Sequence, residues 1–250
     1  MNLVRYMLSR KWILTTLLVI AGAALCVRLG IWQLDRLAQR RAFNAHYLAV
    51  RAEPPLDLNQ AGGQDLTSLE YRQARAEGRY DFESQVALRN QYNDSEYGYH
   101  LLTPLILSEG TALLVDRGWI PADGNGDPSG WRQYDVGGVV QVSGILRRGY
   151  PRAELGGVAD PTLTPAQTRL DIWSAVNLDR IAKQLPFALL PVYLQLDPQA
   201  GDITPPIPFQ PEIEITEGPH AGYAGQWFIF AALLFFGYPL FYLRRQEKKG

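Results

Sequence analysis

The sequence has few of the residues from which metal and redox sites are usually built. It contains one cysteine, Cys26, and three histidines, His46, His100 and His220. A single cysteine excludes a disulfide within the chain and a Cys-x-x-Cys metal or redox motif. Three histidines scattered over the chain also argue against a multi-histidine metal site or a hydrolytic triad. Cys26 itself lies in an apolar run, where a small buried or lipid-facing residue is the expected role.

Catalytic signatures are also missing. The chain has no Gly-x-Ser-x-Gly elbow, Walker A loop, His-Glu-x-x-His motif or dinucleotide fingerprint. The run from Asp123 to Asp127 begins like a calcium loop. However, Pro128 and Tyr134 stand where glycine and the bidentate glutamate are needed, so a polar turn is expected. The sequence therefore does not favour a membrane-tethered hydrolase or oxidoreductase, and we predict a protein that is not an enzyme.

Lysine is almost absent from the middle of the chain. Residues 31–221 contain 24 acidic and 16 basic residues, and Lys183 is the only lysine among them. Residues 1–30 carry a net charge of +4 and residues 222–250 a net charge of +3. Nucleic-acid binding needs a clustered basic face, so this acidic middle argues against it. Basic ends around an acidic body are typical of a membrane protein with cytoplasmic termini.

Two long apolar runs support a membrane protein. The first is about 20 residues long, enough for a helix to cross a bilayer of roughly 30 Å. The positive-inside rule then places both termini in the cytoplasm and the middle outside. The predicted segments are a cytoplasmic N-terminus (1–11), transmembrane helix 1 (12–31), an extracytoplasmic domain with a leading helix (32–221), transmembrane helix 2 (222–243) and a cytoplasmic C-terminus (244–250).

A cleaved signal peptide is the alternative for the first run, since Ala21 to Ala23 would serve as a cleavage site. An uncleaved anchor is preferred, because the helical pattern continues to about Val50 and a second apolar run follows. Pro54 and Pro55 should end this helix.

The middle of the chain has the pattern of strands separated by Gly, Pro, Asp and Asn. Residues 56–75 are polar and are expected to form a loop. A short turn at Ser108–Gly110 predicts an antiparallel hairpin, and Asn177 should cap a short helix over 178–185. The fold class is therefore two transmembrane helices flanking an α+β domain dominated by antiparallel strands. The sequence does not decide whether these strands close into a small barrel. The predicted strands are 85–90, 97–107, 111–120, 138–147, 172–176 and 192–196.

The membrane junctions carry the candidate site residues. Arg28, Trp32, Arg36 and Arg40 recur every four residues on one helical face. They fit two roles: anchoring at the membrane interface, or a wall for an anionic, planar ligand. His220 begins the second junction, followed by Tyr223 and Trp227. An ionisable residue beside the bilayer core is costly and tends to be functional, and a neutral imidazole is a good ligand for haem iron. The residues alone leave ligand and interface anchor equally open for His220.

Several runs together resemble the surfeit locus protein 1 family of membrane-anchored assembly factors for haem–copper cytochrome oxidases. One run, from Gly30 to Arg36, is similar to the family pattern Gly-x-Trp-Gln-x-x-Arg after the first span. A second run, from His220 to Phe228, resembles the family's entry to the second span, although Pro219 stands where members usually have Asn. Between them, matching blocks begin at Gly78, Thr103, Val115, Val142, Trp173 and Pro191.

The resemblance implies an assembly factor that binds haem a transiently and assists its insertion into the oxidase catalytic subunit. On that basis His220 is a candidate axial ligand of the haem iron, and Tyr223, Trp227, Arg28, Trp32 and Arg36 are candidate haem contacts. The block Arg117-Gly118-Trp119 is expected to be structural, with a buried Trp119, a turn at Gly118 and Arg117 paired to a carboxylate. Other oxidase subunits, assembly factors and the lipid bilayer are the expected partners. The alternative is a stably bound accessory subunit of a respiratory oxidase complex, without haem transfer.

Overall fold

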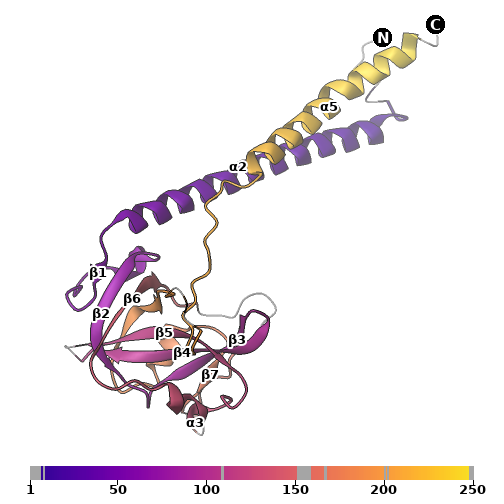
Figure 1. Cartoon of the computed structure of the whole chain (residues 1–250). Helices are drawn as coiled ribbons and strands as arrows, with labels where there is room; N and C mark the ends of the chain where they lie inside the picture. The colour runs from indigo at the N-terminus through magenta and orange to yellow at the C-terminus, as the bar shows by residue number, and fades with distance from the viewer. Residues whose placement is uncertain are drawn as a thin grey trace. The chain divides into compact units, whose positions relative to one another are not determined.

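The computed structural model describes residues 7, 9–107, 110–150, 159–165, 168–199, 201 and 203–247. The chain divides into two compact units, one formed by Met1–His46 with Glu214–Gly250 and the other by Tyr47–Ile213. The first unit contains two long helices, and the second contains the strands (Figure 1).

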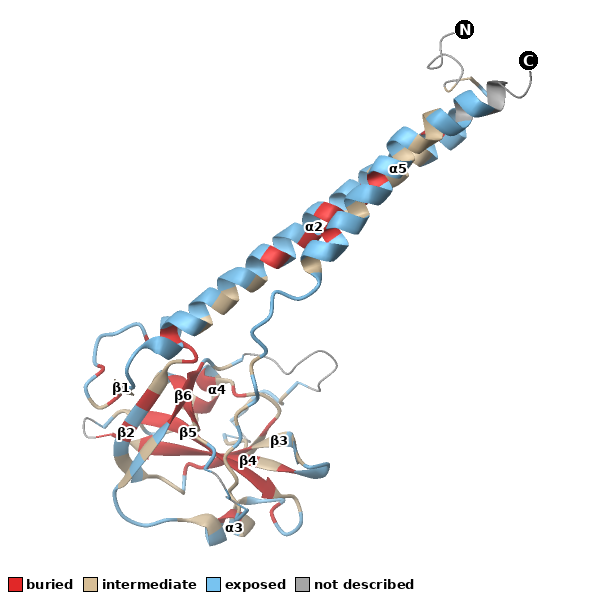
Figure 2. Cartoon of the chain, turned by 45° about the horizontal axis from the view of Figure 1, so that its top comes forward, coloured by how far each residue is buried: buried red, intermediate tan, exposed pale blue. Residues whose placement is uncertain are grey.

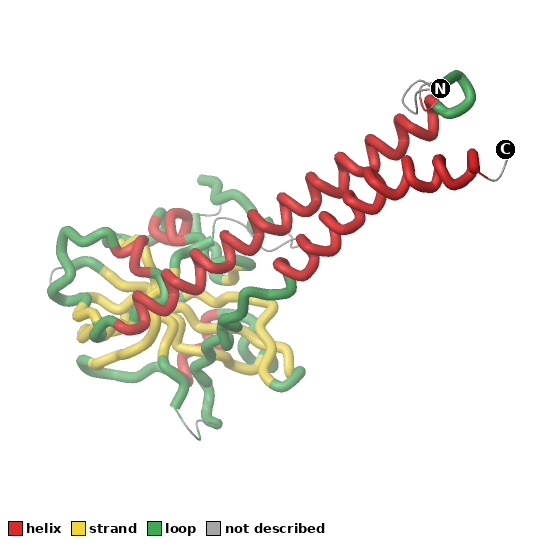
Figure 3. The backbone as a smooth tube through the Cα atoms, turned by 90° about the horizontal axis from the view of Figure 1, so that it is seen from above, coloured by secondary structure: helices red, strands yellow, loops and turns green. Residues whose placement is uncertain are grey.

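The two long helices are α2, Ile13–Ala52, whose residues from Tyr47 onward belong to the second unit, and α5, His220–Glu247. They lie side by side and run in opposite directions (Figure 3). Their contacts begin at Thr16, whose hydroxyl is 2.8 Å from the Tyr238 hydroxyl, and extend to Gln33 and His220. The predicted helical continuation to about Val50 and its end before Pro54 are both present in α2.

A narrow seam joins α2 and α5. Its buried residues recur at intervals of three and four, as in coiled coils, whereas the other faces of both helices are mainly exposed (Figure 2). Small residues let the backbones approach: the Phe228 ring packs so tightly on Gly30 that a β-carbon there would lie 2.6 Å from it. Both helices are long and apolar enough to cross a membrane. The buried seam residues include Cys26, Gly30, Gln33 and Leu37 on α2, and Ala224 and Ala231 on α5.

The second unit is built on a closed five-stranded mixed barrel. Four of its strand pairs are antiparallel (β2–β6, β6–β8, β4–β5 and β2–β4), and β5–β8 is parallel. The short strands β1 and β7 extend the sheet by parallel pairing with β2 and β3. The strands are β1 Leu56–Asp57, β2 Gln73–Tyr80, β3 Val86–Asn93, β4 Glu96–Ile106, β5 Ala112–Pro121, β6 Val140–Arg147, β7 Ile172–Trp173 and β8 Leu189–Leu196.

Strand β5 is apolar on both faces because it lies between two cores. Leu113 and Val115 point into the barrel, where they join side chains from the other four barrel strands. Leu114 points outward into a second cluster that includes Trp173 and Ile181. That outer layer is completed by helix α4, Leu178–Ala182, whose N-cap Asn177 accepts a hydrogen bond from the Arg180 amide as predicted.

The remaining elements are short. The 3₁₀ helices are η1, Leu66–Leu69, and η2, Arg132–Tyr134, and helix α3 covers Pro128–Trp131. Asp127 caps α3 by accepting a 2.8 Å hydrogen bond from the Ser129 amide, and the Asn125 side chain donates to backbone oxygens of the same turn. The segment that starts like a calcium loop is therefore a polar turn, as predicted.

The fold class is confirmed: two long apolar helices flank a β-rich domain, and the barrel is closed. All six predicted strands are present with shifted ends, and β4 and β5 form the predicted antiparallel hairpin. Two residues of its turn, Ser108 and Glu109, lie outside the described residues. The expectation of a loop over 56–75 was wrong, because this stretch contains β1 and η1 and β2 begins at Gln73.

Candidate functional site

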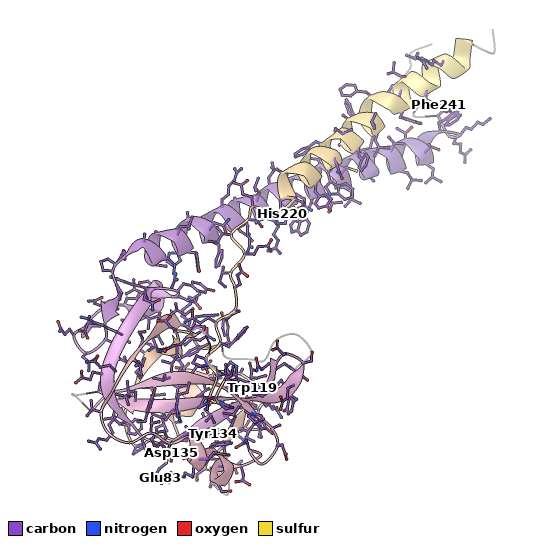
Figure 4. All side chains as sticks on the ribbon, in the orientation of Figure 1. Glu83, Trp119, Tyr134, Asp135, His220 and Phe241 are labelled. Carbon is purple, nitrogen blue, oxygen red and sulfur yellow. The ribbon has the colours of Figure 1, made fainter. Side chains whose placement is uncertain are left out.

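His220 is the first residue of α5 and lies beside α2 (Figure 4). Its Nδ1 is 2.8 Å from the side-chain oxygen Oε1 of Gln33, which is only 8% exposed. A buried amide in an apolar seam is costly unless it forms hydrogen bonds, so this contact stabilises both groups. It also fixes the place along α2 at which α5 begins.

The backbone before His220 is compatible with this position. The Pro219 carbonyl accepts a hydrogen bond from the Tyr223 amide, the first bond of the α5 ladder. Proline lacks an N–H, but the first residues of a helix have no partner for that group in any case. The departure at Pro219 from the family pattern therefore does not disturb the start of the helix.

Arg28, Trp32 and Arg36 follow one face of α2 at the level of His220. With a rise of about 1.5 Å per residue, all three lie within roughly 8 Å of Gln33 along the helix axis. The Arg36 guanidinium lies 5.6 Å from the centre of the Trp32 ring, and Trp32 is 47% exposed. Arg28 and Trp32 also line an open hollow of about 340 Å³ together with Asp35.

Arg36 and Arg28 differ in the number of partners that their guanidinium groups contact. The Arg36 guanidinium donates to Gln39 and stacks on Trp32. In the part of the chain that the structure describes, Arg28 has no ion-pair or hydrogen-bond partner. It is therefore the cation of this face with most donors left for an anionic group.

Arg40 has a structural task. Its guanidinium donates to the backbone oxygens of Thr216 at 2.9 Å and Glu214 at 2.6 Å. Arg41 adds a bidentate ion pair with Glu217 at 2.8 and 2.9 Å. These bonds hold the segment before α5 along α2, so Arg40 is not part of an open ligand wall.

Tyr223 and Trp227 occupy the first two turns of α5. Tyr223 is 46% exposed, whereas Trp227 is half-buried and meets Phe230 edge to face, with ring centres 6.0 Å apart. The structure thus places all six candidates near the His220 end of the helix pair. Within the described residues, no hydrogen bond or ring contact joins Arg28, Trp32 or Arg36 to the candidates on α5.

The other two histidines have ordinary surroundings. His46 is exposed on α2. His100 is buried, with its Nδ1 3.0 Å from an Asp116 carboxylate oxygen, and is therefore a core histidine with a hydrogen-bond partner. No cluster of three or more metal-ligating His, Cys, Asp or Glu side chains occurs among the residues that the structure describes.

The Arg117 block is structural, with two corrections. Trp119 is buried as predicted, but the expected turn at Gly118 was wrong, because Gly118, with a φ of +113°, lies within β5 at an irregularity of the β4–β5 ladder. The predicted pairing of Arg117 to a carboxylate was wrong for the described chain. Its guanidinium donates to Gln85 Oε1 and to the Tyr134 carbonyl, and it lies 5.2 Å from the Tyr80 and Phe82 ring centres. Burial lowers the pKa of Arg117, and the charge of Asp135 opposes this shift only in part.

Sequence reasoning did not select Gln33 as a site residue. The signal that would have found it is positional: Cys26, Gly30, Gln33 and Leu37 repeat at intervals of four, three and four. A polar residue at a seam position of two paired helices needs a partner on the facing helix.

Comparison with known proteins gives a consistent result. The model of the SURF1 family, the surfeit locus protein 1 family, matches residues 20–232. A SURF1-like protein from Mycobacterium bovis is 27% identical over 256 residues, covering 98% of this chain and 90% of the relative. A SURF1-like protein from Rickettsia conorii is 26% identical over 235 residues, covering 91% and 90%. Another from Dictyostelium discoideum is 24% identical over 263 residues, covering 88% and 93%.

Proposed function

The chain belongs to the SURF1 family, and we propose that it binds haem a at the outer membrane interface during assembly of a haem–copper cytochrome oxidase. The family is generally known for cytochrome oxidase assembly factors and is not known as a family of enzymes. In this proposal the protein passes haem a to the oxidase catalytic subunit and contributes binding and orientation rather than catalysis.

The observation that supports a haem site is the His220–Gln33 contact beside the cationic face of α2. His220 would supply an axial nitrogen to the haem iron. Arg28 and Arg36 would pair with propionate carboxylates, because guanidinium matches carboxylate geometry. Trp32, Tyr223 and Trp227 would offer aromatic surface to the macrocycle. When bound, haem a is the cargo and supplies the redox chemistry of the oxidase, not of this chain.

The proposed topology follows from charge. Both termini would be cytoplasmic, α2 and α5 would cross the plasma membrane, and the acidic barrel would lie outside. There the barrel would meet oxidase subunits or other assembly factors. The alternative, a permanent accessory subunit, would use the same helices only for packing.

A spectrum of the purified protein tests the proposal. The full chain is produced in cells that make haem a, purified in detergent without oxidase subunits, and its absorption recorded. A Soret band is expected in the wild type and should be lost in His220→Ala. His46→Ala is the matched control, since His46 is exposed on α2, and it should keep the band. Absence of pigment from the wild type, or an unchanged band in His220→Ala, would refute haem binding at this residue.

A further inference from the structure

Gln33 is a buried polar residue that contacts the candidate ligand directly. Its neighbours in the seam, Gly30 and Leu37, are apolar, and Gln33 itself is 8% exposed. Its side chain reaches across to α5, where the amide oxygen meets His220 Nδ1 at 2.8 Å. This contact satisfies a polar group that would otherwise be costly to bury between two apolar helices.

The chemistry of this contact determines which nitrogen of the His220 ring carries the hydrogen. An amide oxygen only accepts hydrogen bonds, so the imidazole Nδ1 must carry the hydrogen. In a neutral imidazole the other nitrogen, Nε2, then holds the lone pair. Histidines that bind metals usually donate their other ring N–H to an acceptor in this way, which fixes both tautomer and orientation.

We propose that Gln33 is a positioning residue that holds His220 in the Nδ1–H tautomer, with Nε2 presented as the nitrogen that binds haem iron. The role of Nε2 as an iron ligand rests on the proposed haem-binding function. The tautomer of His220 and its dependence on Gln33 are properties of the haem-free chain.

The backbone around the ring supports this arrangement. Gly218 lies next to the Nε2 edge, and a β-carbon at Gly218 would be 3.5 Å from Nε2 and 3.4 Å from Cδ2. Glycine therefore places no side chain of its own against that edge, in a turn where its φ is +66°. Elsewhere in the seam, the close Phe228–Gly30 contact holds the helices near enough for Gln33 to reach His220.

The test measures the tautomer directly. The full chain in detergent, free of haem, is labelled with ¹⁵N-histidine, and each ring nitrogen is identified as protonated or unprotonated by ¹⁵N NMR. His220→Asn assigns the signals among the three histidines. The wild type should show protonated Nδ1 and unprotonated Nε2. Gln33→Glu, which retains an acceptor oxygen, should keep Nδ1 protonated, whereas Gln33→Leu should give a mixture of tautomers.

Gln226→Leu is the matched control, because it makes the same chemical change at an exposed glutamine of α5. It should leave the His220 signals unchanged. A wild-type ring with Nε2 protonated would overturn the inference, since the Gln33 amide would then be donating to Nδ1. A tautomer unaffected by Gln33→Leu would overturn it as well.

Titration with haem a separates this inference from the proposed function. Gln33→Leu should bind haem about 10- to 100-fold more weakly than wild type, the usual effect of removing a partner of a metal-ligating histidine. Gln33→Glu should restore binding and lower the reduction potential of the iron. If no variant binds haem but the tautomer depends on Gln33, the proposed function fails and the positioning role stands. If haem binds through His220 with equal affinity in Gln33→Leu, the positioning role fails and the function stands.

Discussion

His100 and Asp116 form a buried hydrogen-bonded pair between strands β4 and β5. The Asp116 carboxylate contacts His100 Nδ1 at 3.0 Å and accepts hydrogen bonds from the Gly118 amide and, at 3.4 Å, from the Gln195 side chain. Burial lowers the pKa of His100, but the charge and the hydrogen bond of Asp116 outweigh this effect and leave the pKa raised. The folded barrel therefore favours protonated His100.

This pair predicts a pH-dependent stability of the barrel. A raised folded-state pKa contributes stability that is fully present below the unfolded pKa, near 6.5, and is lost as pH rises through the folded value. Asp116→Asn should cost about 1–3 kcal/mol at low pH through weakened buried hydrogen bonds. It should also reverse the slope, because burial alone disfavours the charged ring. Thermal melting of the full chain in detergent between about pH 5.5 and 8.5, followed by tryptophan fluorescence, measures both effects.

The control for that experiment is His46→Gln, since His46 is exposed and its loss should not change the pH profile. A wild-type melting temperature that stays constant over the same pH range would contradict the role given to the His100–Asp116 pair. So would an Asp116→Asn profile parallel to the wild type.

Single residues differ in how far the sequence predicts their roles. His220 was selectable because a titratable group at the end of an apolar run is conspicuous. The partners of the arginines could not be predicted in this way. Arg40 binds backbone carbonyls of residues 214–216, and this contact depends on a segment at least 174 residues away returning to α2. The partners of Arg117 could not be predicted either. A carboxylate was expected beside this cation, but the guanidinium donates to Gln85 and Tyr134 and lies over two aromatic rings.

Among the elements, the α2–α5 pair depends on small residues at its seam. The Phe228 ring occupies the space beside Gly30, and a β-carbon there would lie 2.6 Å from the ring. Gly22 is less crowded, because a β-carbon would lie 3.4 Å from a Leu234 methyl group, an ordinary contact. The two glycines therefore form a natural pair of test and control positions.

Gly30→Ala should separate α5 from α2 and cost about 1–3 kcal/mol, as expected for overpacking. Gly22→Ala should be neutral or slightly stabilising, since alanine is favoured over glycine in helices by about 1 kcal/mol. Hydrogen exchange of residues 220–235, measured by mass spectrometry on the full chain in detergent, should accelerate in Gly30→Ala alone. Adding Phe228→Leu should restore slow exchange. Equal exchange in the two glycine variants would show that the Phe228–Gly30 contact does not hold the pair together.

Strand β2 illustrates why the barrel itself was harder to predict than its strands. Its inward residues are Ala74 and Ala76, and charged residues alternate with them, so the segment lacks the β-branched and aromatic signal of the other strands. Its role comes from closure, which requires pairing of Arg79 and Tyr80 with Ile106 and Leu105. Strands β3 to β8 were predicted because their own side chains show the strand pattern. The closing contact of β2 is non-local and leaves no local pattern.

At the scale of the whole molecule, charge is distributed in the order basic, acidic, basic along the chain. Residues 31–221 hold 24 acidic and 16 basic residues, whereas both ends are basic. Because positive residues near membrane spans are retained in the cytoplasm, this order supports two crossings with both ends inside. Helices α2 and α5 have the length and composition that such crossings need. The orientation stays a prediction that the charges alone support.

Cysteine labelling in intact spheroplasts tests this orientation. Because the chain has a single native cysteine, one substitution removes all background labelling. In a Cys26→Ser background, Tyr92→Cys places a thiol on the barrel at a 65% exposed position, and Lys11→Cys places one before α2. A membrane-impermeant maleimide should label position 92 in intact spheroplasts and position 11 only after the membrane is broken. The Cys26→Ser variant by itself should remain unlabelled in both conditions. Labelling of position 11 together with protection of position 92 in intact spheroplasts would show that the topology is the reverse of the one proposed. It would also place the His220 end of the helix pair on the cytoplasmic face, where a haem site at the outer interface is impossible.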